Sequence, residues 1–380
     1  MEKRIVIILI VFLCSVMVYG HADAISGECS NCHTMHNSQD GAPVNEDGPQ
    51  DYLLNAGCVA CHTAPTGQLS EFNAPVVLHT DPPNGQGGGS TLAGGDFYWV
   101  NLDEVANASL GHNAIDIPGV TFKDTNMPDF NPPGWDPAAT SGFTFGQVAA
   151  GESNWTSQLT CAGSYGCHGS HSVAGSFPGL SGGHHQNTGG TATKADVADT
   201  VGNSYRFLGG IKGLENVGWN WSENPELHNE YFGEDNISDR SSGVNYGTRT
   251  TISFLCAECH GLFHSIIDGD SISGSPWIRH PTDLALPDGG EYALYNTSDG
   301  AAIGNYSLEA PVARVDVPDL SSLTVNAGVD IVMCLSCHRA HGSDQDDLLR
   351  WNYENMIAAG NNSGGCFICH TDKNAQGVNP

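Results

Sequence analysis

Basic residues are scarce in this 380-residue chain, which has 13 lysines and arginines against 42 aspartates and glutamates. The formal net charge is −29 at pH 7 with histidine neutral. A surface this acidic cannot neutralise a phosphate backbone, so the charge balance excludes a nucleic acid as partner. A net charge of this size favours solubility and opposes non-specific association. The sequence has no EF-hand-like loop, so its acidity does not by itself indicate a calcium site.

The apolar run at the N-terminus is too short to span a membrane and has no stop-transfer flank. Lys3 and Arg4 precede this run, which covers 5–19, and small residues typical of a cleavage site follow it. We therefore expect residues 1–24 to be a secretory signal peptide. No interdomain linker stands out in the remainder, so residues 25–380 are expected to form one domain.

Charged residues make up only 14 % of the chain, whereas glycine and proline are abundant, with 48 and 19 copies. This composition gives long loops and few long helices or strands. The sequence therefore predicts a mostly irregular fold with a few short helices and strands. One convincing helix is predicted, over 344–359.

Cysteine occurs in a repeated pattern, Cys-x-x-Cys-His. This pattern is typical of a c-type haem attachment site, in which both thiols form thioethers with the haem and the histidine ligates the iron. A single copy also occurs in zinc and thiol-redox sites, but five copies in one exported chain indicate a multihaem cytochrome. The five copies are Cys29/Cys32/His33, Cys58/Cys61/His62, Cys256/Cys259/His260, Cys334/Cys337/His338 and Cys366/Cys369/His370.

The two remaining cysteines of the mature chain form a longer variant of the pattern. Five residues separate Cys161 from Cys167, and His168 follows at once. A disulfide across a small loop is the alternative for an exported protein. The histidine favours haem, because a structural disulfide has no need of it. We therefore expect six covalently attached haem c groups, whose apolar surfaces replace much of the side-chain core.

Each iron needs a second axial ligand if it is to transfer electrons and do nothing else. Of 17 histidines, His21 lies in the signal segment and six lie in motifs, which leaves ten. This supply allows bis-histidine ligation throughout, which closes the irons to small molecules. His184, His185 and His228 are expected at the surface or beside propionates. Seven candidates then compete for six places: His36, His79, His112, His171, His264, His280 and His341.

Four of these candidates follow their own motif histidine closely: His36, His171 and His341 at three residues, and His264 at four. A residue one turn onward starts on the same side of the haem as the motif histidine, and cannot easily reach the opposite face. Such a histidine is expected to ligate a different haem, which would bring two macrocycles into near contact. The alternative is a histidine that binds a propionate or another polar group.

Eight segments occur along the chain in the order 29–38, 94–100, 111–113, 205–210, 256–264, 279–281, 306–311 and 334–341. In this order they resemble the OmcS family of hexahaem outer-surface cytochromes, which polymerise into extracellular filaments. The resemblance implies bis-histidine haems in alternating parallel-stacked and perpendicular pairs. It also implies that His36 of one subunit ligates the haem on Cys334 and Cys337 of the next. The chain departs from the family in the spacing of its third site and in several shorter loops.

The leading hypothesis is a secreted, polymeric electron conductor at the cell surface, and not an enzyme. It would take electrons from upstream periplasmic cytochromes and pass them to external acceptors. One alternative is a periplasmic or extracellular shuttle with the same haems and no polymer. Another is a reductase of nitrite or a similar oxyanion, which needs an open iron site. Such a site is often signalled by Cys-x-x-Cys-Lys, and that motif does not occur here.

Overall fold

Short helical turns, short strands and connecting loops make up the computed structural model, in agreement with the predicted fold class. The α-helices are α2 (Cys29–Cys32), α3 (Tyr98–Asn101), α4 (Ser176–Gly179), α5 (Ile252–Ala257) and α6 (Gly261–His264). The described residues are 28–39, 41–44, 51–68, 70–72, 74–83, 93–101, 108–117, 131–135, 154–185, 194–215, 226–235, 250–264, 281–292, 295, 303–360 and 363–373. The expected signal peptide lies outside them. Within the described ranges no helix has the length and apolar character that a membrane span requires.

Among the described residues, short 3₁₀ turns outnumber α-helices by ten to five. They are η1 (Asp51–Leu53), η2 (Cys58–Ala60), η3 (Ala108–Leu110), η4 (Val201–Asn203), η5 (Tyr205–Phe207), η7 (Gly290–Tyr292), η8 (Cys334–Ser336), η9 (Asp346–Leu348), η10 (Tyr353–Asn355) and η11 (Gly365–Ile368). Turns this short contribute little stability of their own, so side-chain contacts and bound groups must hold them.

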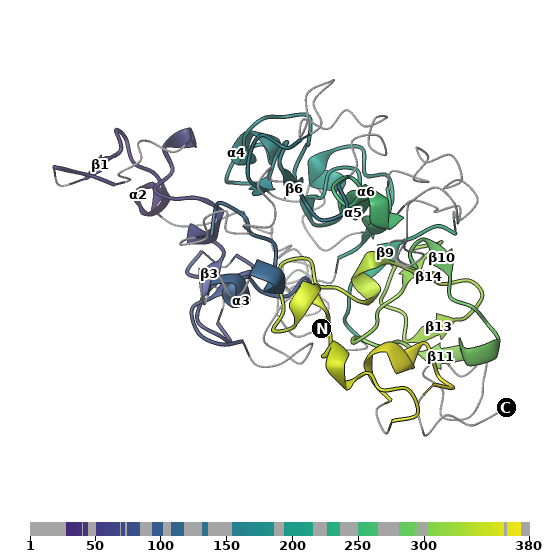
Figure 1. Cartoon of the computed structure of the whole chain (residues 1–380). Helices are drawn as coiled ribbons and strands as arrows, with labels where there is room; N and C mark the ends of the chain where they lie inside the picture. The colour runs from purple at the N-terminus through teal and green to yellow at the C-terminus, as the bar shows by residue number, and fades with distance from the viewer. Residues whose placement is uncertain are drawn as a thin grey trace, which may run out of the picture.

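A sheet of six short strands organises the C-terminal half of the chain, in the order β10-β14-β12-β9-β8-β7 (Figure 1). Its neighbours are antiparallel except β12 and β9, which run parallel. The strands are β7 (Lys194–Ala195), β8 (Gly213–Leu214), β9 (Glu230–Phe232), β10 (Leu284–Ala285), β12 (Ala313–Arg314) and β14 (Ile331–Val332).

Within the described ranges, four strand pairs lie outside this sheet. Two of the pairs, β3 with β4 and β5 with β6, are parallel, and the other two are antiparallel. The pairs are β1 (Ser38–Gln39) with β2 (Ala42–Pro43), β3 (Thr63–Ala64) with β4 (Leu78–His79), β5 (Thr160–Ala162) with β6 (Gly166–His168), and β11 (Ile303–Asn305) with β13 (Thr324–Asn326).

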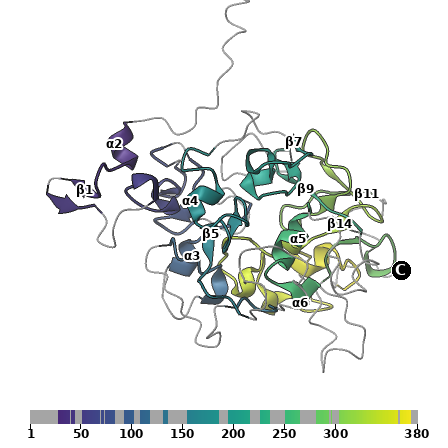
Figure 2. The same cartoon turned by 90° about the horizontal axis from the view of Figure 1, so that it is seen from above.

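The segment of α2 and β1 projects from one end of the molecule, and the β11–β13 pair lies toward the opposite end. Two perpendicular views agree on this arrangement (Figures 1 and 2). The yellow C-terminal part of the chain returns toward α3 in Figure 1, where Gly342 pairs with Gly95 and Gly111.

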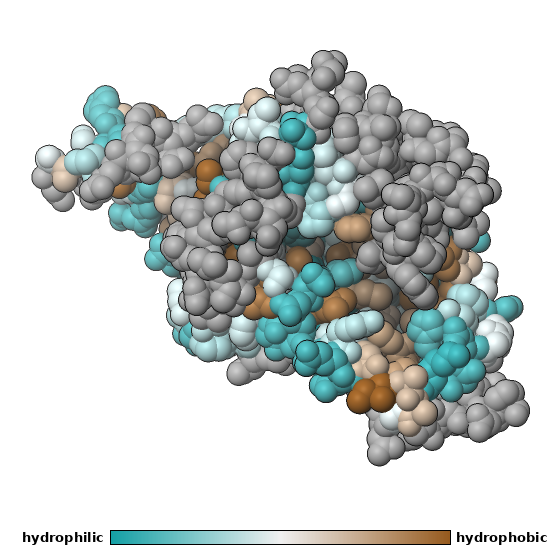
Figure 3. Space-filling view, in the orientation of Figure 1, coloured by the Kyte–Doolittle hydropathy of each residue, from teal (hydrophilic) through white to brown (hydrophobic). Residues whose placement is uncertain are grey.

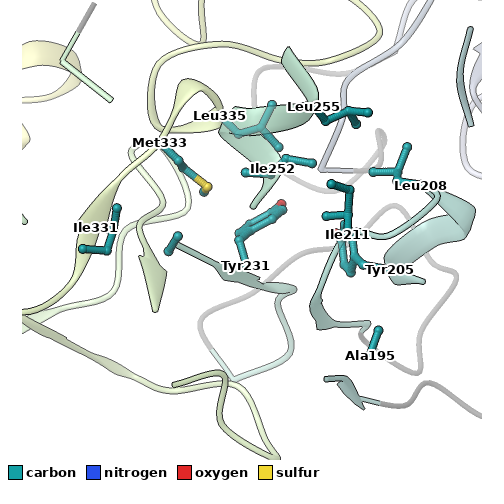
Figure 4. Close-up of a cluster of buried hydrophobic side chains, with 11 residues drawn as sticks. Ala195, Tyr205, Leu208, Ile211, Tyr231, Ile252, Leu255, Ile331, Met333 and Leu335 are labelled. Carbon is teal, nitrogen blue, oxygen red and sulfur yellow. The ribbon is translucent and has the colours of Figure 1, made fainter. Parts of the chain in front are cut away.

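Three apolar clusters lie in the interior of the part of the chain that the structure describes. The first lies on the six-stranded sheet and is shown in Figure 4, where Tyr231 and Ile211 lie near its centre. The second gathers around Trp351, and the third around Phe97. Motif cysteines pack against all three clusters, so each apolar cluster lies beside at least one attachment site. On the face in Figure 3, hydrophobic residues also show between hydrophilic ones.

The helix predicted over 344–359 is wrong. The segment forms η9 and η10, and Asp347, Leu348 and Ala359 have positive φ angles of 58°, 61° and 61°. Contacts with the preceding motif replace the helical hydrogen bonds, because the Asp347 carbonyl accepts a bond from His338 Nδ1 at 2.7 Å. The Arg350 side chain, only 2 % exposed, donates from Nε to the His338 carbonyl at 3.1 Å.

A buried charge network ties the sheet to β13. Arg314 on β12 donates to Glu230 Oε2 on β9 at 3.0 Å, to Asp330 Oδ2, and to the Thr324 carbonyl at 2.7 Å. His228 bonds the other oxygen of Glu230 at 3.1 Å and stacks on another side chain of this region, that of Tyr306, at 3.6 Å. A cation that joins two buried carboxylates is costly to remove, because each would remain charged away from water.

Replacing Arg314 with methionine should lower the thermal transition of the haem-loaded protein, since it leaves Glu230 and Asp330 without this partner. The expected cost is about 3–5 kcal/mol. The matched control is Lys194→Met, which removes a 3.5 Å pair with Asp319, a residue whose side chain is 90 % exposed. That surface pair contributes at most about 1 kcal/mol. Equal melting curves for the two variants, followed by circular dichroism, would contradict a stabilising role for the network.

Candidate haem-binding sites

Helical turns hold the cysteines of the five regular motifs. In four of them the motif histidine donates its backbone N–H to the carbonyl of the first cysteine, four residues earlier. In the second motif, Cys61 donates to Cys58 on η2. A turn of this pitch carries residues three and four apart on one side, so both cysteines of a motif face the same space. These bonds are His33 to Cys29 (2.8 Å), His260 to Cys256 (2.9 Å), His338 to Cys334 (3.1 Å) and His370 to Cys366 (2.9 Å).

The irregular third site is built from strands instead of a turn. Cys161 lies on β5 and Cys167 on β6, and the two strands pair side by side with Ala162 opposite His168. Residues 163–165 connect the two strands, and the pairing of the strands brings the two cysteines side by side. All twelve cysteines in the described part of the chain are free thiols, including this pair. The disulfide considered for this site is therefore absent from the structure.

Cysteines of consecutive motifs adjoin one another. Burial, and then the charge of Cys32 and a hydrogen bond with it, raise the pKa of Cys61 to about 11. A hydrogen bond between the side chains of Cys58 and Cys161, together with burial, raises the pKa of Cys161. The ligand atoms of Cys58, Cys161 and Asp116 lie within 4.8 Å of one another. Because both sulfurs belong to motifs, we read this cluster as the contact between the second and third sites and not as a separate metal site.

The same succession continues through the later motifs. A hydrogen bond joins a thiol of the fourth motif to one of the fifth. The third and fourth motifs, and the fifth and sixth, have thiols close enough to affect each other electrostatically, in addition to the larger effect of burial. Burial raises the pKa of Cys259 and raises that of Cys369 to about 12. In the hydrogen-bonded pair, the shared bond raises the pKa of Cys256 and lowers that of Cys334. These links join Cys256 with Cys334, Cys167 with Cys259, and Cys337 with Cys369.

Hydrogen bonds at Nδ1 orient the motif histidines. Five of them face a backbone carbonyl, which leaves Nε2 as the unprotonated nitrogen that a metal needs. The sixth, His370, instead faces the Glu291 carboxylate at 3.2 Å, and a hydrogen bond from Lys373 lowers the pKa of that carboxyl. The carbonyl contacts are His33–Tyr52 (3.0 Å), His62–Pro75 (2.8 Å), His168–Arg206 (2.9 Å), His260–Pro133 (2.7 Å) and His338–Asp347 (2.7 Å).

Four motif histidines each face a second histidine at nearly the same separation. An imidazole nitrogen binds a metal such as zinc at about 2 Å, so two imidazoles on opposite sides of one metal have ring centres about 6 Å apart. The observed separations fit a bis-histidine iron at each of these sites. The pairs are His33–His184 (5.8 Å), His62–His185 (6.1 Å), His168–His341 (6.3 Å) and His260–His112 (6.1 Å).

Burial keeps several of these imidazoles neutral, as a metal ligand must be. It is the main cause that lowers the pKa of His168 to about 4 and that of His341 to about 3. The pKa values of His62 and His112 are also lowered, again chiefly by burial. His112 resembles a motif histidine, since its Nδ1 faces the Ala340 carbonyl at 2.6 Å.

His171, which the sequence ranks as a ligand, has both ring nitrogens engaged. Its Nε2 lies 3.1 Å from the Cys167 carbonyl and its Nδ1 lies 2.7 Å from Glu258 Oε2. Both ring nitrogens face oxygen atoms that can accept a proton, which favours a protonated ring over one that offers a lone pair to iron. The hydrogen bond and charge of Glu258 accordingly raise its pKa against the opposing effect of burial. In this structure the residue binds a carboxylate of the fourth motif.

The other candidates differ in how they are placed. His79 is 1 % exposed; its Nδ1 lies 2.5 Å from Asp96 Oδ2, and its Nε2 is buried without a hydrogen-bond partner among the described residues. A metal would satisfy that nitrogen. His36 is exposed beside Met35, whose exposure is 76 %. His280 lies outside the described residues, and His264 is described only as the last residue of α6.

Sequence reasoning missed that the adjacent pair His184–His185 faces two motif histidines; it ranks both among surface or propionate partners, and His184 does lie exposed at the surface. The two rings face the histidines of the first and second motifs, which themselves lie close together in the sequence. The sequence signal that could have indicated this arrangement is that two adjacent histidines can serve two motifs that are neighbours in the sequence. His228 also differs from its ranking, because it is fully buried in the Arg314 network.

Comparison with known proteins agrees with these sites. Residues 326–375 match the family described as a doubled CXXCH motif, which covers the fifth and sixth sites. The C-type cytochrome OmcS of Geobacter sulfurreducens is 25% identical over 92% of this chain and 84% of its own length.

Two solved structures of OmcS filaments from the same organism also match. One covers 90% of this chain and 88% of its own, with 23% identity and a TM-score of 0.47. The other covers 93% and 92%, with 21% identity and a TM-score of 0.43. The resemblance predicted from the sequence is confirmed: the chain is similar to an OmcS-type cytochrome along nearly its whole length.

Proposed function

We propose that this protein is a multihaem c-type cytochrome that conducts electrons along six bis-histidine haem c groups and assembles into an extracellular filament. The observation that carries the proposal is the set of four histidine pairs with ring centres 5.8 to 6.3 Å apart, each with one motif histidine. This geometry supports irons that are closed on both sides, which favours electron transfer over catalysis.

The residues of the chain have distinct roles in this proposal. The twelve cysteines hold the porphyrins in thioether linkage, and the six motif histidines ligate the irons. Backbone carbonyls at Nδ1 fix the tautomer and the ring orientation, which keeps the ligand geometry the same in both oxidation states. His184, His185, His341 and His112 provide distal ligands for the first four sites. Bound haem c supplies a one-electron ferric/ferrous couple.

The succession of adjoining cysteines supports a route in chain order, from the first site to the sixth. Each motif has a thiol beside a thiol of the next motif, so consecutive macrocycles attached there would lie edge to edge or face to face. Short steps of this kind suit electron transfer without a moving partner.

Assembly and location are inferred from the similarity to OmcS together with the exposed N-terminal segment. His36 lies on the projecting segment between α2 and β1, where a second copy can reach it (Figure 2). It would ligate the iron of His338 in that copy, which leaves His79, His264 and His280 as candidates for the sixth site. The filament would be secreted, with periplasmic cytochromes as donors and external acceptors at its other end.

Three measurements on the purified protein test this function. Pyridine haemochrome analysis should give six haems per chain, and the reduced protein should bind far less than one carbon monoxide per chain. Electron microscopy of concentrated samples should show filaments. Stoichiometric carbon monoxide binding would indicate an open iron site and favour a reductase. Fully loaded particles that stay monomeric at high concentration would favour a soluble shuttle.

A further inference from the structure

The sixth site differs from the other five in the group that faces its motif histidine. His370 Nδ1 lies 3.2 Å from a carboxylate oxygen of Glu291, where each of the others faces a neutral carbonyl. The second oxygen of Glu291 lies 3.1 Å from Lys373 Nζ. This contact is longer than the five carbonyl contacts, but a charged acceptor polarises the imidazole N–H more strongly than a neutral one does. The sequence patterns of the six motifs give no hint of this difference.

The backbone fixes the carboxylate in position. Glu291 lies on η7, and its carbonyl accepts bonds from the Thr371 N–H at 2.7 Å and the Thr371 hydroxyl at 2.8 Å. Thr371 directly follows His370, so the residue that carries the carboxylate is bound to the segment that carries the imidazole. The position of the Glu291 carboxylate beside His370 is therefore fixed by backbone hydrogen bonds between η7 and the sixth motif, and does not depend on the two side chains alone.

We propose that Glu291 and Lys373 act as an opposed pair that sets the reduction potential of the haem at the sixth site. The inference rests on the proposed role of His370 as an iron ligand. A carboxylate draws the Nδ1 proton toward itself and increases the electron density that Nε2 offers to iron. It therefore stabilises the ferric state and lowers the potential. Lys373 withdraws charge from the same carboxylate and raises the potential.

The consequence is a terminal site whose potential is set separately from those of the interior sites. The side chains of His370, Glu291 and Lys373 are 41%, 27% and 53% exposed, so the pair lies where the sixth site meets solvent. Solvent weakens the charge interaction but does not remove the direct hydrogen bond. The chain can thus tune the last haem through two surface residues and leave the motif itself unchanged.

The test is a spectroelectrochemical titration of the haem-loaded protein and of two variants with opposite expected effects. Glu291→Gln retains an acceptor and removes the charge, and should shift the midpoint potential of one haem of the six upward. Lys373→Met should shift the same haem downward. The matched control is Glu309→Gln, because Glu309 is an exposed carboxylate that binds the Gly365 N–H at 2.8 Å, beside the same motif.

Opposite shifts of a single haem, larger than the shift in the control, support the pair. Unchanged potentials in both variants, shifts in the same direction, or a shift no larger than that of Glu309→Gln would overturn it. His370→Ala separates failure of this inference from failure of the proposed function. If all six haems remain low-spin by electron paramagnetic resonance in that variant, His370 is not a ligand and the proposed site assignment fails. Loss of one low-spin signal, with unchanged potentials in Glu291→Gln, refutes the tuning alone.

Discussion

Replacing His36 with alanine should give a haem-loaded protein that no longer forms filaments. His33 and both cysteines of the first motif remain, so the first site keeps its own attachment. The variant loses an iron–imidazole bond at every junction between subunits. A loss of only about 3 kcal/mol per junction lowers the association constant about 100-fold, and a coordination bond in a dry contact should exceed that. Negative-stain microscopy and size-exclusion chromatography measure the change.

The neighbouring residue provides the control for this experiment. Met35 is 76 % exposed on the same segment, and the proposed junction uses the imidazole of His36 and not the Met35 side chain, so Met35→Ala should assemble nearly as the wild type does. The His36→Ala protein should also show one iron with an open side, which carbon monoxide detects in the reduced state. Filaments of normal length with unchanged spectra would exclude His36 from the junction.

Replacing His185 with alanine should convert the second site from a closed to an open iron. The ring of His185 faces His62 at 6.1 Å, and it is held by Phe207 at 5.0 Å and by the Gly182 carbonyl at 3.2 Å. The variant should bind about one carbon monoxide per reduced chain and show a high-spin ferric signal, since one of two strong ligands is gone. His184→Ala should do the same at the first site, and the double variant should bind two.

His171→Gln is the variant that best distinguishes the distal ligands expected from the sequence from those indicated by the structure. The spacing after the third motif ranks His171 as a ligand, whereas the structure engages both of its nitrogens with Cys167 and Glu258. The substitution should therefore leave all irons low-spin and carbon monoxide binding unchanged. An open site in His171→Gln, together with closed sites in His185→Ala, would reverse the assignment of distal ligands.

The candidate attachment residues can be named from the sequence because thioether attachment requires a fixed spacing, and their role stays a prediction. Cys29, Cys32 and His33 lie on one turn, and a structure this local is determined by residues that are neighbours in the sequence. The irregular fold could be predicted for a related reason: abundant glycine and proline oppose long elements. The geometry of the third site could not be predicted in this way, because its two cysteines are brought together by the pairing of β5 with β6 and not by a single turn.

Distal histidines were harder to predict, because their partners come from distant parts of the chain. His184 is 151 positions from His33 (184 minus 33), and no periodicity links them. The predicted helix over 344–359 failed for a similar reason. Its apolar and charged residues suit a helix, but the Asp347 carbonyl and the Arg350 side chain bind the fifth motif instead. Tertiary contacts with a motif outweigh a propensity of a few tenths of a kcal/mol per residue, about the usual range.

The adjoining cysteines of consecutive motifs place the six proposed haem sites in series, as the elements of an electrical circuit can be. Each proposed site touches the one before it and the one after it, and the thiol contacts found among the described residues provide no bypass. In a branched network a damaged centre costs a fraction of the current. In a series it stops the current, and in a polymer it does so for every subunit beyond the break. A single unfilled site would therefore act as a dominant defect, so quality control of haem attachment before assembly matters more here than in a protein that works alone.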